Sequence, residues 1–192
     1  MERSTLGFWL LVAVLLGASL FYGSEVSQLR AAQQPRDVAL ASGDVVGAVQ
    51  VLDGDTLVVA KEGAGQATVR LLGIKAFEAK VAKDEAAPHG RAAEEALRRA
   101  TAGQPLRVLL NNPPRDRHGR TLATLYAGVD DIALGLVARG HALVYTVYPF
   151  AQMPAYLQAQ GAARQQRLGL WADPAVSERA DGLIREWARA AP

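Results

Sequence analysis

A tight turn between two runs of strand-forming residues is the feature that most constrains the fold of this chain. The turn, Asp53–Asp55, has glycine at its centre and separates Val45–Leu52 from Thr56–Ala60. An Asp-Gly pair between two Val- and Leu-rich runs is a strong signal for a β-hairpin. A third such run, Ala67–Ile74, follows a glycine-rich turn. The sequence therefore predicts a three-stranded meander.

The pattern after the meander predicts helices between and after two further strands. An apolar stripe of Ala93, Leu97 and Ala100 indicates a helix that ends at Gly103. The elements expected beyond it are strands at Leu106–Leu110 and Leu122–Tyr126, a short helix capped by Asp130 and Asp131, and a helix at Pro154–Arg167. Five short strands with about three helices indicate an α+β fold built on a five-stranded β-barrel of the OB type.

The N-terminal residues are of a different kind, because Leu6–Tyr22 is uncharged and almost wholly apolar. Such a run indicates a membrane helix, either a single-pass anchor or the core of a signal peptide. The small residues suited to cleavage, Gly17 and Ser19, are followed by further apolar residues, which favours an uncleaved anchor. Residues 1–23 are therefore expected to anchor the chain in a membrane, with the remainder on the extracytoplasmic side.

The rest of the chain divides into a linker, a globular domain and a C-terminal helix. Residues 24–43 are rich in Gln, Ala, Arg and Ser without periodicity, which is typical of a flexible linker. Residues 44–172 contain all the predicted strands and can bury one sizeable core. Residues 173–192 place Val176 and Trp187 on one face of an amphipathic helix. We expect this helix to dock on the domain's own core, with a membrane surface or a partner as the alternative.

The composition permits a nucleic-acid partner without requiring one. The net charge is +2 and the pI is near 9.1, with an excess of arginine, whose forked donors suit phosphate. The absence of cysteine excludes disulfides and thiolate metal sites. The histidines, His89, His118 and His141, lie far apart in the sequence and lack partners at metal-ligand spacing.

Charged residues around the meander form the candidate site. Carboxylates stand at the hairpin, Asp53 and Asp55, and just after the third strand, Glu78. Arginines stand in the third strand, Arg70, and in a later tight turn, Arg120. Hydrolysis of a phosphodiester needs parts of this kind: a carboxylate for a hard cation, a base that activates water, and guanidinium groups for the charge developing on phosphorus. The order of these residues along the chain is more informative than any one of them.

Six ordered motifs resemble the staphylococcal nuclease, or thermonuclease, family from about Val46 to Trp171. They are VLDGDTLVV, VRLLGIKAFE, HGRAAEEAL, DRHGRTLATLY, DIALGLVARGHALV and RQQRLGLW. The interval from Glu78 to Gly90 is similar to the family's as well. The resemblance implies a decorated OB barrel that hydrolyses DNA and RNA using calcium.

The resemblance also implies a role for each candidate residue. Asp55 would be the first calcium ligand, whereas Asp53 would serve the turn itself. Arg70 and Arg120 would bind phosphate, and Glu78 would activate the attacking water. An active enzyme would thus use Arg70, Glu78 and Arg120 for catalysis, with Ca²⁺ as its cofactor.

The chain departs from the family's pattern directly after the third strand. The family reads aspartate, threonine, proline and glutamate there, and this chain reads Lys75, Ala76, Phe77 and Glu78. Lysine therefore replaces the second metal carboxylate, and the missing proline removes a restriction on how Glu78 faces the site. An ammonium about 5 Å from a divalent cation repels it by roughly 6 to 7 kcal/mol at an effective dielectric constant near 20. A millimolar calcium site is worth only about 4 kcal/mol, so calcium should not bind unless the lysine turns into solvent.

Two interpretations of Lys75 stay open, and they belong to different functional classes. In one, the chain is a nuclease in which Lys75 points outward or its ammonium replaces part of the metal's charge. In the other, the chain is a pseudonuclease with Lys75 paired to Asp55 or Glu78. Loss of the catalytic calcium ion favours this second interpretation, because hydrolysis depends on the charge of that ion. The barrel would then be a membrane-anchored binding or scaffolding module. Its partners would be nucleic acid or the proteins of a membrane assembly.

Three aromatic residues, Tyr145, Tyr148 and Phe150, form an expected cluster near the third helix. Such side chains can stack on bases, but packing in or around the core is the favoured interpretation. His118 is likewise expected to be a surface residue of the arginine turn rather than a substrate contact.

Overall fold

The structure, a computed structural model, describes residues 38–81, 83–116 and 118–190. The expected anchor and most of the expected linker lie outside these residues. Within the described part of the chain, no helix has the length and apolar character needed to cross a membrane.

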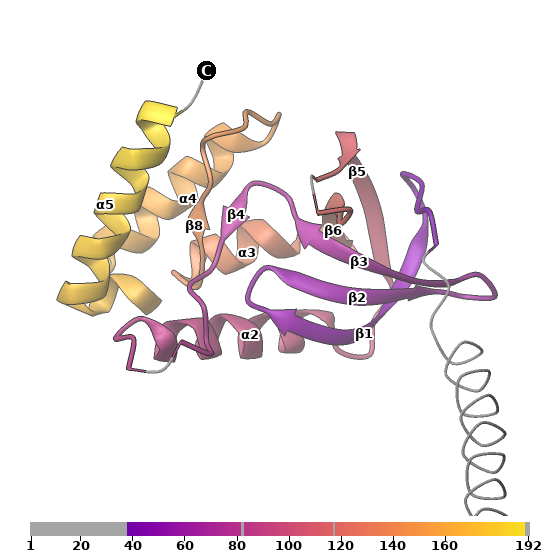
Figure 1. The fold of residues 1–192 in the computed structure, drawn as a ribbon, viewed down its shortest axis with the longest axis horizontal. Coiled ribbons are helices and arrows are strands. Elements are labelled where there is room, and N and C mark those ends of the chain that lie inside the picture. Colours follow the sequence, from indigo (N-terminus) through magenta and orange to yellow (C-terminus); the bar gives the residue numbers. More distant parts are fainter. Residues whose placement is uncertain (1–37, 82, 117, 191–192) are drawn as a thin grey trace, which may run out of the picture. The chain divides into compact units, whose positions relative to one another are not determined.

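Five strands close into a barrel, as the sequence predicts. They are β1 (Val45–Asp53), β2 (Thr56–Lys61), β3 (Gly65–Leu71), β5 (Leu106–Arg115) and β6 (Thr121–Ala127). Neighbouring strands pair antiparallel in the order β3-β2-β1-β5-β6, and a parallel pairing of β3 with β6 joins the two ends of this row (Figure 1). A two-residue strand, β7 (Asp130–Asp131), adds to the outside of β6. Closure gives both terminal strands of the row a partner.

The Asp53–Asp55 turn forms the predicted hairpin between β1 and β2. Asp53 lies opposite Thr56, and its carboxylate accepts a hydrogen bond from the backbone N–H of Asp55 at 2.9 Å. An aspartate that bonds the backbone two residues further on stabilises a turn of this kind. Asp53 therefore serves the turn, which is the role expected for it.

The third strand is shorter than predicted, because the chain turns at Gly73. Ile74–Lys75 form a separate strand, β4, which pairs antiparallel with β8 (Leu143–Val144). Gly73 has a φ of +75°, and a Cβ at this position would lie 2.2 Å from the ring of Phe150. Glycine tolerates both the left-handed backbone and the close approach of the ring. This turn takes β4 out of the barrel sheet.

The helices of the described chain number four. They are α2 (Ala87–Thr101), α3 (Ile132–Ala138), α4 (Met153–Gln165) and α5 (Pro174–Ala190), with a short 3₁₀ turn, η1 (Gly169–Ala172), before the last. The three helices predicted within the domain and the predicted C-terminal helix are thus all present. Asp131 caps α3 by accepting a hydrogen bond from the backbone N–H of Leu134 at 3.0 Å.

Buried side chains form two clusters. The larger, the barrel core, joins the inside of the barrel to the faces of α2, α3 and α4. The smaller, the outer core, consists of Phe77, Ala86, Leu143, Ala163, Leu170, Trp171, Val176, Ala180 and Trp187. The last three of these belong to α5, so the C-terminal helix docks on the domain as expected (Figure 1).

The first described residues already pack with the barrel. The backbone N–H of Val38 donates to the carbonyl of Gln66 in β3 at 2.9 Å, and Leu40 is a buried member of the barrel core. Residues 38–43 are therefore part of the packed domain, although they fall in the range expected for the linker.

Candidate functional site

Closure of the barrel brings the two candidate phosphate-binding arginines together. Arg70 lies opposite Leu122 in the parallel pairing of β3 with β6, and Arg120 directly precedes β6. Burial, followed by the positive charge of Arg120, lowers the pKa of Arg70 to about 10. Arg70 therefore stays charged at neutral pH, and the two guanidinium groups share one electrostatic environment.

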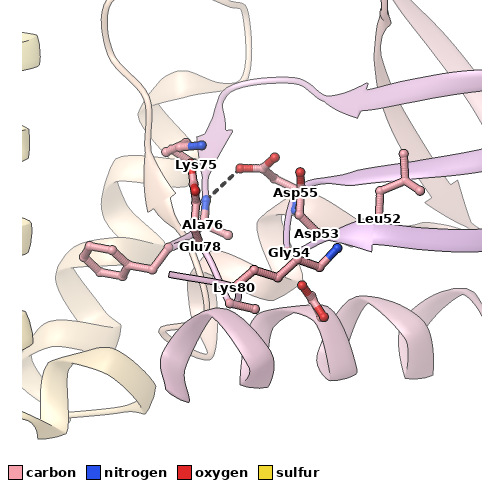
Figure 2. A pocket seen from close by; sticks show the side chains of 11 residues that line it. Leu52, Asp53, Gly54, Asp55, Lys75, Ala76, Glu78 and Lys80 are labelled. Atoms are coloured by element: carbon pink, nitrogen blue, oxygen red, sulfur yellow. Dashed lines mark hydrogen bonds between the residues drawn. The ribbon is translucent and has the colours of Figure 1, made fainter. Parts of the chain in front are cut away.

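Asp55 is buried at the hairpin, and both of its carboxylate oxygens bind groups within the domain. Its side chain is 1% exposed. One oxygen, Oδ1, accepts a hydrogen bond from the hydroxyl of Thr56 at 3.1 Å and forms an ion pair with the guanidinium of Arg70. The other, Oδ2, accepts a hydrogen bond from the backbone N–H of Ala76 at 2.8 Å, the dashed line in Figure 2. The carboxylate thus ties the hairpin to β3 and to the residue after β4.

A pocket of about 260 Å³ opens beside this carboxylate. Its walls are the hairpin turn, residues 52–55, the segment of residues 75–80, and Glu94 of α2 (Figure 2). We call residues 76–81 the pocket segment, since they lead from the pocket toward α2. The pocket therefore combines carboxylates and ammonium groups.

Lys75 lines the pocket at the end of β4 and is partly buried. Burial, followed by the charge of Arg70, lowers the pKa of its ammonium, whereas the charges of Asp53 and Glu78 raise it. Within the described chain, the ammonium forms no ion pair with a carboxylate, since Asp55 pairs with Arg70 instead. The pairing of Lys75 with Asp55 or Glu78, expected from the sequence, is not formed.

Arg120 is held by a carboxylate that the sequence pattern did not single out. Its Nε and Nη2 each lie 2.7 Å from Oδ2 of Asp116, and its backbone N–H donates to Oδ1 at 2.9 Å. Burial, the largest influence, raises the pKa of Asp116, but hydrogen bonds from Arg120 and His118 lower it below its ordinary value. The available signal was the DRHGR motif itself, in which an aspartate stands four residues before the arginine.

Glu78 is exposed at the edge of the pocket, while its backbone is closely packed. A Cβ on Gly90 of α2 would lie 2.6 Å from backbone atoms of Glu78 and Ala79, so glycine is what lets the helix touch the pocket segment. On the other side, Phe77 is 8% exposed and belongs to the outer core. The buried side chain of Phe77 thus restrains this segment at the position where the family pattern has a proline.

The residues at the pocket do not fit a calcium ion. Calcium takes about six to eight oxygen ligands, among them several carboxylates. Asp55 is already bound to Arg70 and Ala76, and the position expected for the second carboxylate presents the ammonium of Lys75. Across the described residues, no three His, Asp or Glu side chains are placed to hold a metal ion. The calcium site that the resemblance implies is therefore not built by these side chains.

The aromatic residues before α4 do not form a single cluster. Tyr145 packs against Tyr148, with ring centroids 6.1 Å apart, and against Trp187 of α5 at 5.0 Å. Phe150 instead packs against Tyr156 at 5.0 Å. Packing rather than exposure, the favoured interpretation, is confirmed for Tyr145 and Phe150, whereas Tyr148 is 70% exposed.

The structure brings the candidate residues together to different degrees. Asp55 and Arg70 touch, and Arg120 is close enough to Arg70 to lower its pKa. Glu78 and Lys75 line the pocket on the side of β4. Each arginine of the site is therefore paired with a carboxylate, whereas Lys75 and the exposed Glu78 line the pocket without an ion pair in the described chain.

Comparison with known proteins supports this fold. A family model described as staphylococcal nuclease homologue matches residues 68–173. The thermonuclease of Staphylococcus hyicus is 25% identical over 174 residues, which cover 90% of this chain and 100% of that protein. An uncharacterized endonuclease of Escherichia coli is 35% identical over 127 residues, 65% of this chain and 75% of that protein. Protein ParB of Escherichia coli is 32% identical over 141 residues, 68% of this chain and 73% of that protein.

Proposed function

Because the chain belongs to the staphylococcal nuclease homologue family, we propose that it is a nuclease-like domain that has lost calcium-dependent hydrolysis and acts as a binding or scaffolding module for nucleic acid. The observation that carries this proposal is the state of Asp55, whose carboxylate is buried and paired with Arg70 while Lys75 stands at the next ligand position. Relatives named thermonuclease and endonuclease support nucleic acid as the ligand.

Two energetic costs oppose calcium at this pocket. Asp55 would have to leave Arg70, and breaking a buried ion pair costs about 3 to 5 kcal/mol when one charge is left unpaired. An ammonium about 5 Å away would add roughly 6 to 7 kcal/mol of repulsion at an effective dielectric constant near 20. Rotation of the partly buried Lys75 toward solvent relieves the second cost but not the first. Together they exceed the roughly 4 kcal/mol that a millimolar calcium site provides.

A second candidate function, hydrolysis without calcium, is favoured by a different observation. The carboxylate of Glu78 is exposed beside the pocket, where it can take a proton from an attacking water. The guanidinium groups of Arg70 and Arg120 would counter the charge on phosphorus. Both guanidinium groups are paired with carboxylates, Asp55 and Asp116. This pairing weakens their electrostatic attraction for a phosphate.

The native chain is expected to bind single-stranded DNA or RNA without calcium-dependent cleavage. Calorimetric titration should give a calcium dissociation constant above about 1 mM. Cleavage of a labelled oligonucleotide is followed with calcium and with a chelator, and binding of the same oligonucleotide is measured by fluorescence anisotropy. Binding that calcium does not change, without cleavage, agrees with the proposal.

Glu78→Gln distinguishes hydrolysis by this chain from a contaminating nuclease. If the second function holds, cleavage persists in the chelator and falls by at least about a hundredfold in Glu78→Gln, the usual contribution of a general base. Calcium-dependent cleavage by the native chain would contradict both functions.

We further propose that residues 6–22 anchor this domain in a membrane, with the domain on the extracytoplasmic side. The uncharged apolar run at these positions supports the anchor. The full chain should sediment with membranes and resist carbonate extraction, and protease added outside intact cells should digest the domain. A soluble product that lacks the N-terminal residues would instead show that the segment is cleaved.

A further inference from the structure

The helix α5 lies outside the segment that the family model matches, yet it contacts the loop that leads away from the pocket. The match ends at residue 173, and α5 begins at Pro174. Near the start of α5, Arg179 forms an ion pair of 2.5 Å with Asp84. The guanidinium of Arg179 also lies over the ring of Phe77, 5.3 Å from its centroid. One side chain of this helix therefore contacts both Phe77 in the pocket segment and Asp84 before α2.

The contact with Phe77 matters because this residue connects the pocket to the outer core. Phe77 lines the pocket and is also buried with Val176, Ala180 and Trp187 of α5. The opposite side of the same segment touches α2 at Gly90. The pocket segment is thus held between two helices, one of which lies in the matched part of the chain and one of which does not.

Asp84, the ion-pair partner of Arg179, is itself held in place by a hydrogen bond. The carboxylate of Asp84 accepts a hydrogen bond from the backbone N–H of Ala86 at 2.9 Å. This bond, and next the bond from Arg179, lower the pKa of Asp84, so the carboxylate is charged at neutral pH. A charged, 13% exposed carboxylate gives the guanidinium a fixed partner while it covers the Phe77 ring.

We propose that α5 is a clamp on the pocket segment, and that Arg179 is the positioning residue that fixes how this segment presents Glu78 to the pocket. Arg179 acts through Phe77 and Asp84 and does not itself line the described pocket. The inference deepens the proposed function, since it treats the same pocket as the binding site. It concerns the conformation of the segment, so its test needs no nucleic acid.

Amide hydrogen exchange of the full chain tests the clamp. In Arg179→Ala, exchange in the pocket segment, measured at the Ala76 amide that donates to Asp55, should become about fivefold to tenfold faster, because one ion pair and one cation–π contact are lost. Arg185→Ala is the matched control, since Arg185 is exposed on the same helix and makes no ion pair with the described residues. Arg179→Lys should restore most of the protection, because an ammonium can contact both the carboxylate and the ring.

The outcomes separate a clamp from general support of the fold. Faster exchange confined to residues 76–81, rescued by lysine and absent in Arg185→Ala, supports the proposal. Unchanged exchange in Arg179→Ala overturns it, and so does an equal increase in exchange across the barrel strands, which would mean that Arg179 only stabilises the domain. If the native chain fails to bind nucleic acid, the proposed function is wrong, but the exchange result stands by itself.

Discussion

Exchanging Lys75 for aspartate should produce calcium-dependent cleavage of nucleic acid at a rate at least about a hundredfold above that of the native chain, equivalent to about 2.7 kcal/mol in the barrier. The substitution removes the ammonium that repels a divalent cation and adds a carboxylate to the pocket wall. The remaining cost is the release of Asp55 from Arg70. Initial rates on a labelled single-stranded oligonucleotide, with calcium and with a chelator, measure the effect.

Lys80→Asp is the matched control for this gain of activity. Lys80 also lines the pocket, so the variant makes the same change of charge at a position that the resemblance does not assign to a metal ligand. Activity in Lys75→Asp but not in Lys80→Asp would show that the identity of residue 75 decides calcium binding. Equal rates in the native chain and in Lys75→Asp would mean that the lysine is not what limits the reaction.

Asp55→Asn should lower the free energy of unfolding by about 3 to 5 kcal/mol, because it leaves a buried guanidinium without its counter-charge. The side chain of Arg70 is 13% exposed, and its partner Asp55 is 1% exposed. The amide can still accept the bond from the backbone of Ala76, so the loss comes mainly from the ion pair. Urea denaturation should show a midpoint lower by more than about 1 M with an unchanged slope.

Glu78→Gln provides the comparison for this loss of stability. Glu78 is exposed and has no ion pair within the described chain, so its neutralisation should change the free energy of unfolding by less than about 0.5 kcal/mol. If Asp55→Asn were as harmless as Glu78→Gln, the Asp55 carboxylate would not be compensating a buried charge. Release of Asp55 from Arg70 would then not oppose calcium binding at this pocket.

The architecture follows from local signals that a sequence displays directly. An Asp-Gly turn between strand-forming runs and helical stripes ended by glycine predicted the five barrel strands and all four helices, but β5 continues to Arg115, where a loop was predicted after Leu110. These signals are reliable because turn chemistry and periodicity act over a few residues. The extent of the third strand was mispredicted, since the apolar run continues through Gly73 while the backbone turns there against Phe150.

The candidate site was predicted as a set of residues but not as a set of contacts. The order of Asp55, Arg70, Glu78 and Arg120 along the chain suggested phosphodiester chemistry, and Lys75 was evident as a departure from the family. Which carboxylate neutralises which cation could not be predicted, because it depends on how segments far apart in the chain pack. The pair of Arg70 with Asp55, and the absence of a pair for Lys75 in the described chain, are of this kind.

By itself, the sequence determined the barrel, its helices, the family and the presence of a lysine where a metal carboxylate is expected. Tertiary structure alone decided that Asp55 is buried against Arg70 and that Phe77 joins the pocket segment to α5. Both outcomes have one physical reason. The strength of a charge pair or an aromatic contact is set by the water that surrounding elements exclude, and those elements meet only when the chain is folded.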